Sequence, residues 1–310
     1  MNIFFYAPFY AGYGTGNITR MAALYEFLRQ SIKEHSLFFF SNSLNNQNIL
    51  DKLGYAIKIT NTPDLNFHLG FFDSPINFSK GFLENEKEIS QIREFRKRTT
   101  KLIAFDLFNK VPFFDIAINL LPPDIRIPHT TYFTGLEYAI IKEEVLQQKS
   151  NVVQQPNKKV LITIGGEDKE NLSQKVIDSF SAYPAYHLVV LKGASNTNIL
   201  HVSKNIRVLE NTQKIGEFIN NSAFVISGAG NTLLEAIYLG KPTIVVPRNY
   251  HEKIFFDYLR QNIPLFQLDQ VDMLINEDEN FFSKIRVKYF TSLDGKGKVR
   301  IRDIVSSLHE

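Results

Sequence analysis

The chain alternates short apolar runs with longer amphipathic or polar stretches. Each apolar run has the length of a buried strand, and several of the stretches between them carry apolar residues at helical spacing. The runs expected as strands are residues 2–7, 37–40, 55–59, 67–72, 102–105, 116–120, 160–164, 187–191, 223–226 and 243–246. Strands that alternate with helices predict parallel α/β sheets covered on both faces.

Helices are expected where apolar residues recur every three or four positions. One begins just after residue 17 and carries Ile18, Met21, Ala22, Tyr25 and Leu28 on one face. Others are expected at 83–101, from 172 onward, from 232 to a Gly-Lys-Pro stop at 240–242, and at 299–308.

The chain of 310 residues exceeds the length at which one core usually divides. Helical periodicity disappears at 148–157, a polar stretch that contains Pro156. We therefore expect an N-terminal α/β domain at 1–147, a linker at 148–157, a C-terminal α/β domain at 158–294 and a terminal helix at 295–310.

Composition narrows the classes of partner and site. The net charge of +3 comes without a block of Lys and Arg, so nucleic-acid binding is not indicated, while an anionic small ligand or a weak membrane-surface contact stays open. The chain has no cysteine, which excludes disulfides, zinc–thiolate sites and a thiol nucleophile. It shows neither a secretory signal nor an apolar run of membrane-spanning length, and a cytoplasmic location is expected.

A glycine-broken turn follows the strand at 223–226. Gly228 and Gly230 permit a tight turn, and the N-terminus of the next helix is suited to bind phosphate. The same residues have a purely structural interpretation, because Thr232 to Glu235 fits a capping box in which Glu235 satisfies the helix's own amide. From spacing alone the two interpretations are equally supported.

A second glycine-rich loop follows the first strand, with Gly14 and Gly16 before Asn17. Asn17 occupies the expected N-cap position of the next helix, which favours a structural role on local grounds. Asp73 and Asp106 each follow a predicted strand. Because ligands of parallel sheets bind beyond the carboxyl ends of the strands, both aspartates are candidates for function, although each could instead cap a helix.

Four stretches, taken in order, resemble one family. Residues 14–20 resemble the GxGHxxR loop of the UDP-sugar hydrolase of pseudaminic acid biosynthesis, a nonulosonic acid pathway, and residues 135–144 resemble its GxxYAL[IL]RxEF segment. Residues 161–172 resemble its GGxDxxNL loop, and residues 227–247 its final nucleotide loop and GxP strand. Relatives of this family include spore-coat polysaccharide proteins and the peptidoglycan N-acetylglucosaminyltransferase. Each motif alone is weak, but the ordered set is fairly specific.

The resemblance implies a GT-B fold, in which two Rossmann-like domains enclose an active site in the cleft between them. The C-terminal domain would then bind the nucleotide diphosphate of a UDP-type sugar, which is substrate rather than cofactor. On the matching positions, Gly165 and Gly166 would approach the diphosphate, Glu235 would bind the ribose hydroxyls and Val208 would lie near the base. The remaining ligand-binding candidates are Gly14, Gly16, Gly228, Gly230, Asn231, Thr232 and His251.

One position departs from the family pattern. The loop histidine, expected there to act as general base or to position water, is Asn17 in this chain. An amide does not accept a proton near neutral pH, and general-base catalysis contributes about 10²–10⁴-fold. Either another group acts as the base, with Asp73, Asp106, His68 and His129 as candidates, or the chemistry is different.

Three functions follow from these residues. The first is a metal-independent glycosyltransferase of surface-glycan synthesis, which would need an acceptor such as a glycan or a lipid-linked sugar; the chain has no DxD metal motif. The second is a nucleotide-sugar hydrolase with a relocated base. The third is a non-catalytic protein that binds a sugar nucleotide. The substitution at Asn17 favours transfer over hydrolysis.

Overall fold

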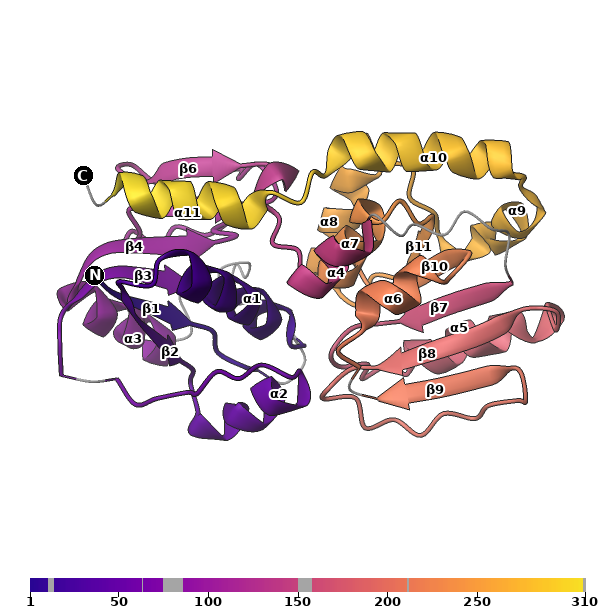
Figure 1. The fold of residues 1–310 in the computed structure, drawn as a ribbon, viewed down its shortest axis with the longest axis horizontal. Helices are drawn as coiled ribbons and strands as arrows, with labels where there is room; N and C mark the ends of the chain where they lie inside the picture. The colour runs from indigo at the N-terminus through magenta and orange to yellow at the C-terminus, as the bar shows by residue number, and fades with distance from the viewer. Residues whose placement is uncertain (11–13, 63, 75–85, 150–157, 211, 309–310) are drawn as a thin grey trace. The chain divides into compact units, whose positions relative to one another are not determined.

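The computed structural model describes residues 1–10, 14–62, 64–74, 86–149, 158–210 and 212–308. They form two compact units (Figure 1). The first comprises 1–13, 17–140 and 296–310, and the second comprises 14–16 and 141–295. Each unit is built around one sheet in which every described strand pair is parallel.

The first unit contains a six-stranded sheet with the order β2-β1-β3-β4-β5-β6. Its strands are β1 (Asn2–Tyr6), β2 (Ser36–Phe40), β3 (Phe67–Phe72), β4 (Thr99–Phe105), β5 (Ile116–Asn119) and β6 (Thr131–Thr134). Its helices are α1 (Gly16–Ser31), α2 (Gln47–Lys52), α3 (Glu86–Lys97) and α11 (Gly297–Ser307), with short 3₁₀ turns at Leu44–Asn46 and Leu136–Tyr138.

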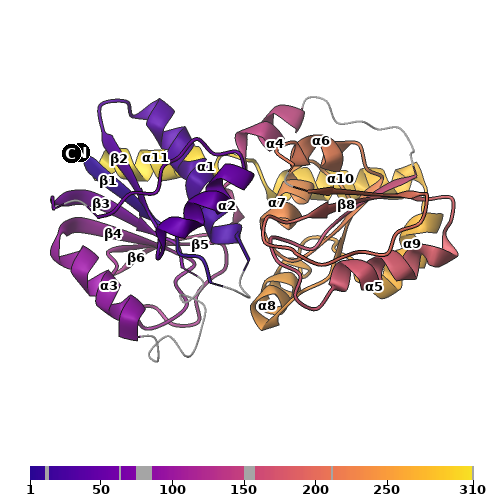
Figure 2. The same ribbon diagram turned by 90° about the horizontal axis from the view of Figure 1, so that it is seen from below.

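Both faces of this sheet are covered, because successive strand residues point to opposite sides. Ile3 and Phe5 of β1 pack in one core with α1 and α11, whereas Phe4 and Tyr6 pack in the other with α3. Figure 2 shows α1 and α3 on opposite faces of the sheet. The last helix of the chain therefore completes the first unit, as the yellow α11 in Figure 1 shows.

The second unit contains a five-stranded sheet with the order β11-β10-β7-β8-β9. Its strands are β7 (Lys159–Thr163), β8 (His187–Lys192), β9 (Ile206–Glu210), β10 (Phe224–Ser227) and β11 (Thr243–Val245). Its helices are α4 (Glu143–Gln148), α5 (Leu172–Ser179), α6 (Ile215–Asn220), α7 (Asn231–Tyr238), α8 (Tyr250–Leu259), α9 (Val271–Asn276) and α10 (Glu279–Ser292), with 3₁₀ turns at Phe180–Ala182 and Leu268–Gln270. Helices α5 and α6 lie on opposite faces of this sheet (Figure 2).

The structure differs from the sequence-based expectations in several elements. Residues 55–59 form no strand and contribute one isolated bridge, from Ile59 to Phe39. The helix expected at 83–101 ends at Lys97, and its last residues begin β4. The two compact units divide after Ile140, with α4 in the second unit, and the first unit resumes at Lys296. The linker expected at 148–157 stays a prediction. Residues 150–157 of that expected linker lie outside the described residues.

None of the helices that the structure describes combines the length and the apolar character needed to cross a membrane.

Candidate functional site

The glycine turns of the second unit lie at the carboxyl ends of two neighbouring strands. Strand β7 pairs with β10, with Thr163 opposite Ser227, so the turn that contains Gly165 and Gly166 starts beside the turn that starts at Gly228. Gly165 has φ of 101°, a conformation that residues with a side chain rarely adopt. The two turns that the resemblance assigns to the diphosphate therefore lie side by side, and their contact with a ligand stays a prediction.

Arg248 and Glu252 lie against these glycine turns. A Cβ added to Gly165 would lie 3.0 Å from the Arg248 guanidinium carbon, and one added to Gly228 would lie 3.0 Å from Glu252 Oε2. Arg248 Nε donates to Glu252 Oε1 at 2.8 Å, and Nη2 donates to the same oxygen. Glu252 Oε2 accepts from the backbone N–H groups of Ala229 at 3.2 Å and of Arg248 at 2.9 Å. A partly buried ion pair thus lies beside the turns to which the resemblance assigns the diphosphate.

Glu235 lies in α7 with 1% of its surface exposed. Its Oε1 is 3.4 Å from Lys142 Nζ, and its Oε2 is buried without a hydrogen-bond partner among the described residues. Burial raises the pKa of this carboxyl, the nearby Lys142 opposes the increase, and Glu144 adds to it. A buried acceptor without a partner is costly and is a frequent mark of a functional site.

The capping-box interpretation of Glu235 is wrong. Helix α7 begins at Asn231 with Gly230 as its N-cap, so Thr232 is not the cap and the Glu235 carboxylate contacts Lys142. Gly230 is exposed, with no atom within 4 Å of the position that a Cβ would occupy. Among the described residues, space is therefore left beside Gly230 for a ligand atom.

Other predicted ligand-binding residues are spread around this sheet. Asn231 Nδ2 donates to Gly16 O at 2.9 Å within the second unit, which includes 14–16. His251 is the second residue of α8 and is half-buried, and burial lowers its pKa. Val208 lies in the middle of the edge strand β9, opposite Val190, rather than at the end of the strand. Its contact with a base stays a prediction.

The aspartate of the GGxDxxNL-like loop has a structural role. The two carboxylate oxygens of Asp168 accept from the backbone N–H groups of Leu172 at 2.7 Å and Ser173 at 2.8 Å. Asn171 precedes α5 in the left-handed conformation and makes no side-chain cap. Asp168 thus satisfies the first amides of α5 and holds the loop that carries Gly165 and Gly166.

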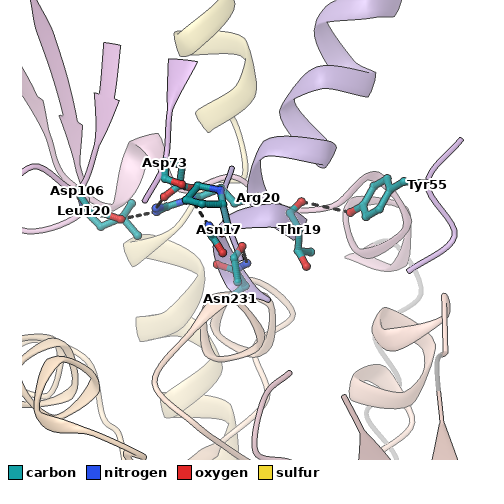
Figure 3. Close-up of polar contacts among 10 residues, drawn as sticks. Asn17, Thr19, Arg20, Tyr55, Asp73, Asp106, Leu120 and Asn231 are labelled. Atoms are coloured by element: carbon teal, nitrogen blue, oxygen red, sulfur yellow. Dashed lines mark hydrogen bonds and ion pairs between the residues drawn. The ribbon is translucent and has the colours of Figure 1, made fainter. Parts of the chain in front are cut away.

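The first unit contains a second charged cluster, formed by Arg20, Asp73 and Asp106 (Figure 3). Arg20 of α1 donates to both carboxylate oxygens of Asp73 at 2.7 Å and, through Nη1, to Asp106 Oδ2. Asp106 Oδ1 accepts from the Leu120 amide at 3.0 Å. The cluster therefore connects α1 to the carboxyl ends of β3, β4 and β5.

The charges of this cluster perturb one another. Burial lowers the pKa of Arg20, but the carboxylates of Asp106 and Asp73 outweigh burial and raise it. Burial raises the pKa of Asp73, Arg20 opposes the increase, and Asp106 adds to it. Both aspartates are buried, with 1% of Asp73 and 4% of Asp106 exposed. This geometry favours a role in positioning the N-terminus of α1 over direct proton abstraction by either carboxylate.

Asn17 lies next to this cluster but is not the helix cap. Helix α1 begins at Gly16, so Asn17 is already within the first turn. Its Nδ2 donates to the backbone oxygens of Pro8 and Asp73, the latter at 3.2 Å. The side chain therefore connects the loop after β1 to the end of β3, which adjacent residues in the sequence could not reveal.

The two histidine candidates for the base lie at the other edge of the sheet. His129 is exposed, has φ of 69° and precedes β6, whose first residue Thr131 pairs with the start of β5. His68 is exposed near the start of β3, where its Nδ1 accepts from the Asn2 amide. The turn into β6 that carries His129 thus lies at the amino ends of the strands, whereas Asp73 and Asp106 follow the carboxyl ends. A catalytic role of His129 stays a prediction.

Sequence analysis missed Arg248 and did not single out Glu88. Glu88 of α3 is 1% exposed, and its carboxylate accepts from the Tyr10 hydroxyl at 2.7 Å and from the Ser74 hydroxyl. Burial raises its pKa against these hydrogen bonds. Glu88 is one of many charged residues in its helix, and Arg248 stands in the short segment between β11 and α8, where no sequence motif marks it. Among the described residues, no three His, Asp or Glu side chains gather as a site for a metal ion.

Comparisons with known proteins cover both units. Residues 130–255 match the model of the glycosyltransferase family 28 C-terminal domain. The chain is 23% identical over 321 residues to the uncharacterized protein MJ1062 of Methanocaldococcus jannaschii, with 96% of this chain and 64% of that protein covered. It is 22% identical over 330 residues to the spore coat polysaccharide biosynthesis protein SpsG of Bacillus subtilis, with 96% and 95% covered. The chain thus spans less than two thirds of the archaeal relative.

Solved structures share the fold at low identity. The crystal structure of Acinetobacter baumannii MurG matches with a TM-score of 0.60 and 11% identity, over 99% of each chain. The structure of S. aureus MnaA with UDP matches with a TM-score of 0.58 and 13% identity, over 98% of this chain and 95% of that one. These neighbours establish a likeness of fold over the whole chain. The chain has the GT-B fold, as the family resemblance implied.

Proposed function

We propose that the protein is a metal-independent glycosyltransferase that uses a UDP-type sugar in the synthesis of a surface glycan. The observation that carries this proposal is the second unit's glycine turns, which adjoin Arg248 and the N-terminus of α7. This unit contains most of the match to the glycosyltransferase family 28 C-terminal domain. The SpsG similarity supports a surface polysaccharide as the product class.

The leaving group of such a reaction is a nucleoside diphosphate, so the transition state gains negative charge on phosphate. Backbone N–H groups at a helix N-terminus and a guanidinium stabilise that charge without a proton transfer. In the second unit the α7 N-terminus and Arg248 provide both groups. Glu235 has an unpartnered buried oxygen that the ribose hydroxyls would satisfy.

Asn17 favours transfer over hydrolysis. Its amide group donates to two backbone oxygens and cannot accept a proton from water near neutral pH. The two carboxylates that were candidates for the base, Asp73 and Asp106, are buried and paired with Arg20. In a transfer reaction the nucleophile is the acceptor rather than water. An acceptor that is deprotonated by another group, or that is itself a good nucleophile, does not need a base at position 17.

The test is diphosphate release from a panel of UDP-sugars with and without acceptors. Release only when a glycan or lipid-linked acceptor is present supports transfer. Release in water alone would identify a hydrolase with a relocated base, and binding without release would identify a non-catalytic protein. Asn17→His supplies the missing imidazole, so we expect acceptor-independent release to rise in this variant and to remain at background in Asn17→Ala.

A further inference from the structure

We infer that Arg248, held in place by Glu252, is the residue that binds the diphosphate group of the ligand. This inference rests on the proposed function and assigns a specific side chain to it. Arg248 follows β11 and precedes Asn249, the N-cap of α8. The chain direction at this point brings the guanidinium back over the ends of β7 and β10, where the glycine turns lie.

The glycine turns make room for the guanidinium. A Cβ on Gly165 would lie 3.0–3.3 Å from three atoms of the Arg248 guanidinium group, and a Cβ on Gly228 would lie 3.4 Å from its Nε. Contacts at the short end of this range force a neighbour to move. Glycine at both positions therefore lets a planar cation lie directly on the two turns, in the place where the sequence motifs predict a diphosphate.

Glu252 fixes the orientation of this cation and accepts a hydrogen bond from one backbone amide of the turn. Its Oε2 accepts the Ala229 N–H at 3.2 Å, so this amide is not free for phosphate in the structure. Its Oε1 accepts from Arg248 Nε at 2.8 Å and from Nη2. The turn therefore offers fewer backbone donors than its sequence predicts, and the guanidinium supplies the charge that a diphosphate needs.

Arg248 retains donors for a ligand. A guanidinium has five N–H groups in a fixed planar arrangement. Within the described part of the chain, three of them are used, two toward Glu252 and one from Nη1 to the Glu167 backbone oxygen at 2.9 Å. Its side chain keeps 17% of its surface exposed. The two remaining N–H groups match the paired oxygens of a phosphate, which arginine binds in bidentate fashion.

The experiment compares calorimetric titrations of wild type, Arg248→Ala and a double variant with UDP and with inorganic pyrophosphate. The double variant, Arg248→Gln with Glu252→Gln, removes both charges and therefore leaves no uncompensated buried carboxylate. It serves as the test if the single variant fails to fold. Lys253→Ala, on an exposed position of the same helix, is the matched control. Circular dichroism establishes that each variant is folded.

We expect the Arg248 variants to bind both ligands roughly 10- to 100-fold more weakly, the scale of losing charge-assisted hydrogen bonds, while Lys253→Ala binds like wild type. Wild-type affinity for pyrophosphate and UDP in a folded Arg248 variant would overturn the inference and leave the proposed function standing. Pyrophosphate binding that depends on Arg248, without binding of any nucleoside diphosphate, would retain the inference and refute the proposed function. Binding of neither ligand by wild type would overturn both.

Discussion

Glu235→Gln separates a ligand-binding role of Glu235 from a structural one. The carboxylate is 1% exposed, is 3.4 Å from Lys142 Nζ, and has an Oε2 without a partner. Replacement of such a poorly compensated buried charge by a neutral amide of the same size is commonly neutral or stabilising. Lys142 keeps 27% of its side chain exposed, so it stays hydrated in the variant. We expect the free energy of unfolding of Glu235→Gln at pH 7 to equal that of wild type or to exceed it by up to about 2 kcal/mol.

The same substitution should weaken ligand binding. Loss of hydrogen bonds between a charged carboxylate and the ribose hydroxyls costs about 1.5–3 kcal/mol, or roughly 10- to 150-fold in Kd. Calorimetry with UDP measures this loss, and 2′-deoxy-UDP tests its origin. If Glu235 binds the ribose, the substitution should weaken UDP more than deoxy-UDP, so that the two affinities converge in the variant.

Glu144 is the contrasting position for this experiment. Its carboxylate accepts from the Gly216 amide at 2.9 and 3.1 Å and thereby holds α4 against α6. Glu144→Gln should lower the free energy of unfolding by about 1–2 kcal/mol and leave UDP affinity unchanged. The account of Glu235 is refuted if Glu235→Gln binds UDP like wild type with its fold intact, or if it is destabilised as Glu144→Gln is.

Two further substitutions test the first unit. Arg20→Ala leaves the buried Asp73 beside a second carboxylate, which should destabilise the protein by about 3–5 kcal/mol at pH 7. Because the folded-state pKa of Asp73 then rises further above its unfolded value near 4, urea titrations should show this loss of stability shrinking as the pH falls from 7 to 5. A loss of stability that does not change with pH would contradict the assignment. Gly297→Ala places a Cβ 2.2 Å from the Ala139 backbone oxygen, so the melting transition should report a loss of about 1–3 kcal/mol that Ser306→Ala, on the same helix, does not show.

The strands and glycine turns could be predicted from the sequence because both depend on local patterns. Continuous apolar runs mark strands that are buried on both faces, and the turns follow directly from the positions of glycine. Residues 55–59 show the limit of this method, since an apolar run at the edge of a sheet forms only the bridge at Ile59. Alternation of apolar residues cannot tell whether a neighbouring strand is available to pair.

The side chains of the candidate sites were harder to predict because their partners are distant in sequence. The pairing of Arg20 with Asp73 and Asp106 joins α1 to strand ends 53 and 86 residues away. Arg248 contacts a turn that lies 81 residues earlier. His129 comes just before β6, and only the register of β6 with β5 shows that it lies at the amino ends of the strands, opposite the carboxyl ends that carry Asp73 and Asp106. Spacing identifies residues that follow strands, and the parallel register decides which of them meet.

The central claim is that the second unit binds a nucleoside diphosphate. Calorimetric titration of the intact protein with UDP, CDP, GDP and dTDP tests it most directly. The account predicts saturable binding of one stoichiometric equivalent, with UDP tightest and with affinity reduced in Glu235→Gln. Absence of binding by all four diphosphates to the folded protein would contradict the account and remove nucleotide-sugar transfer as its function.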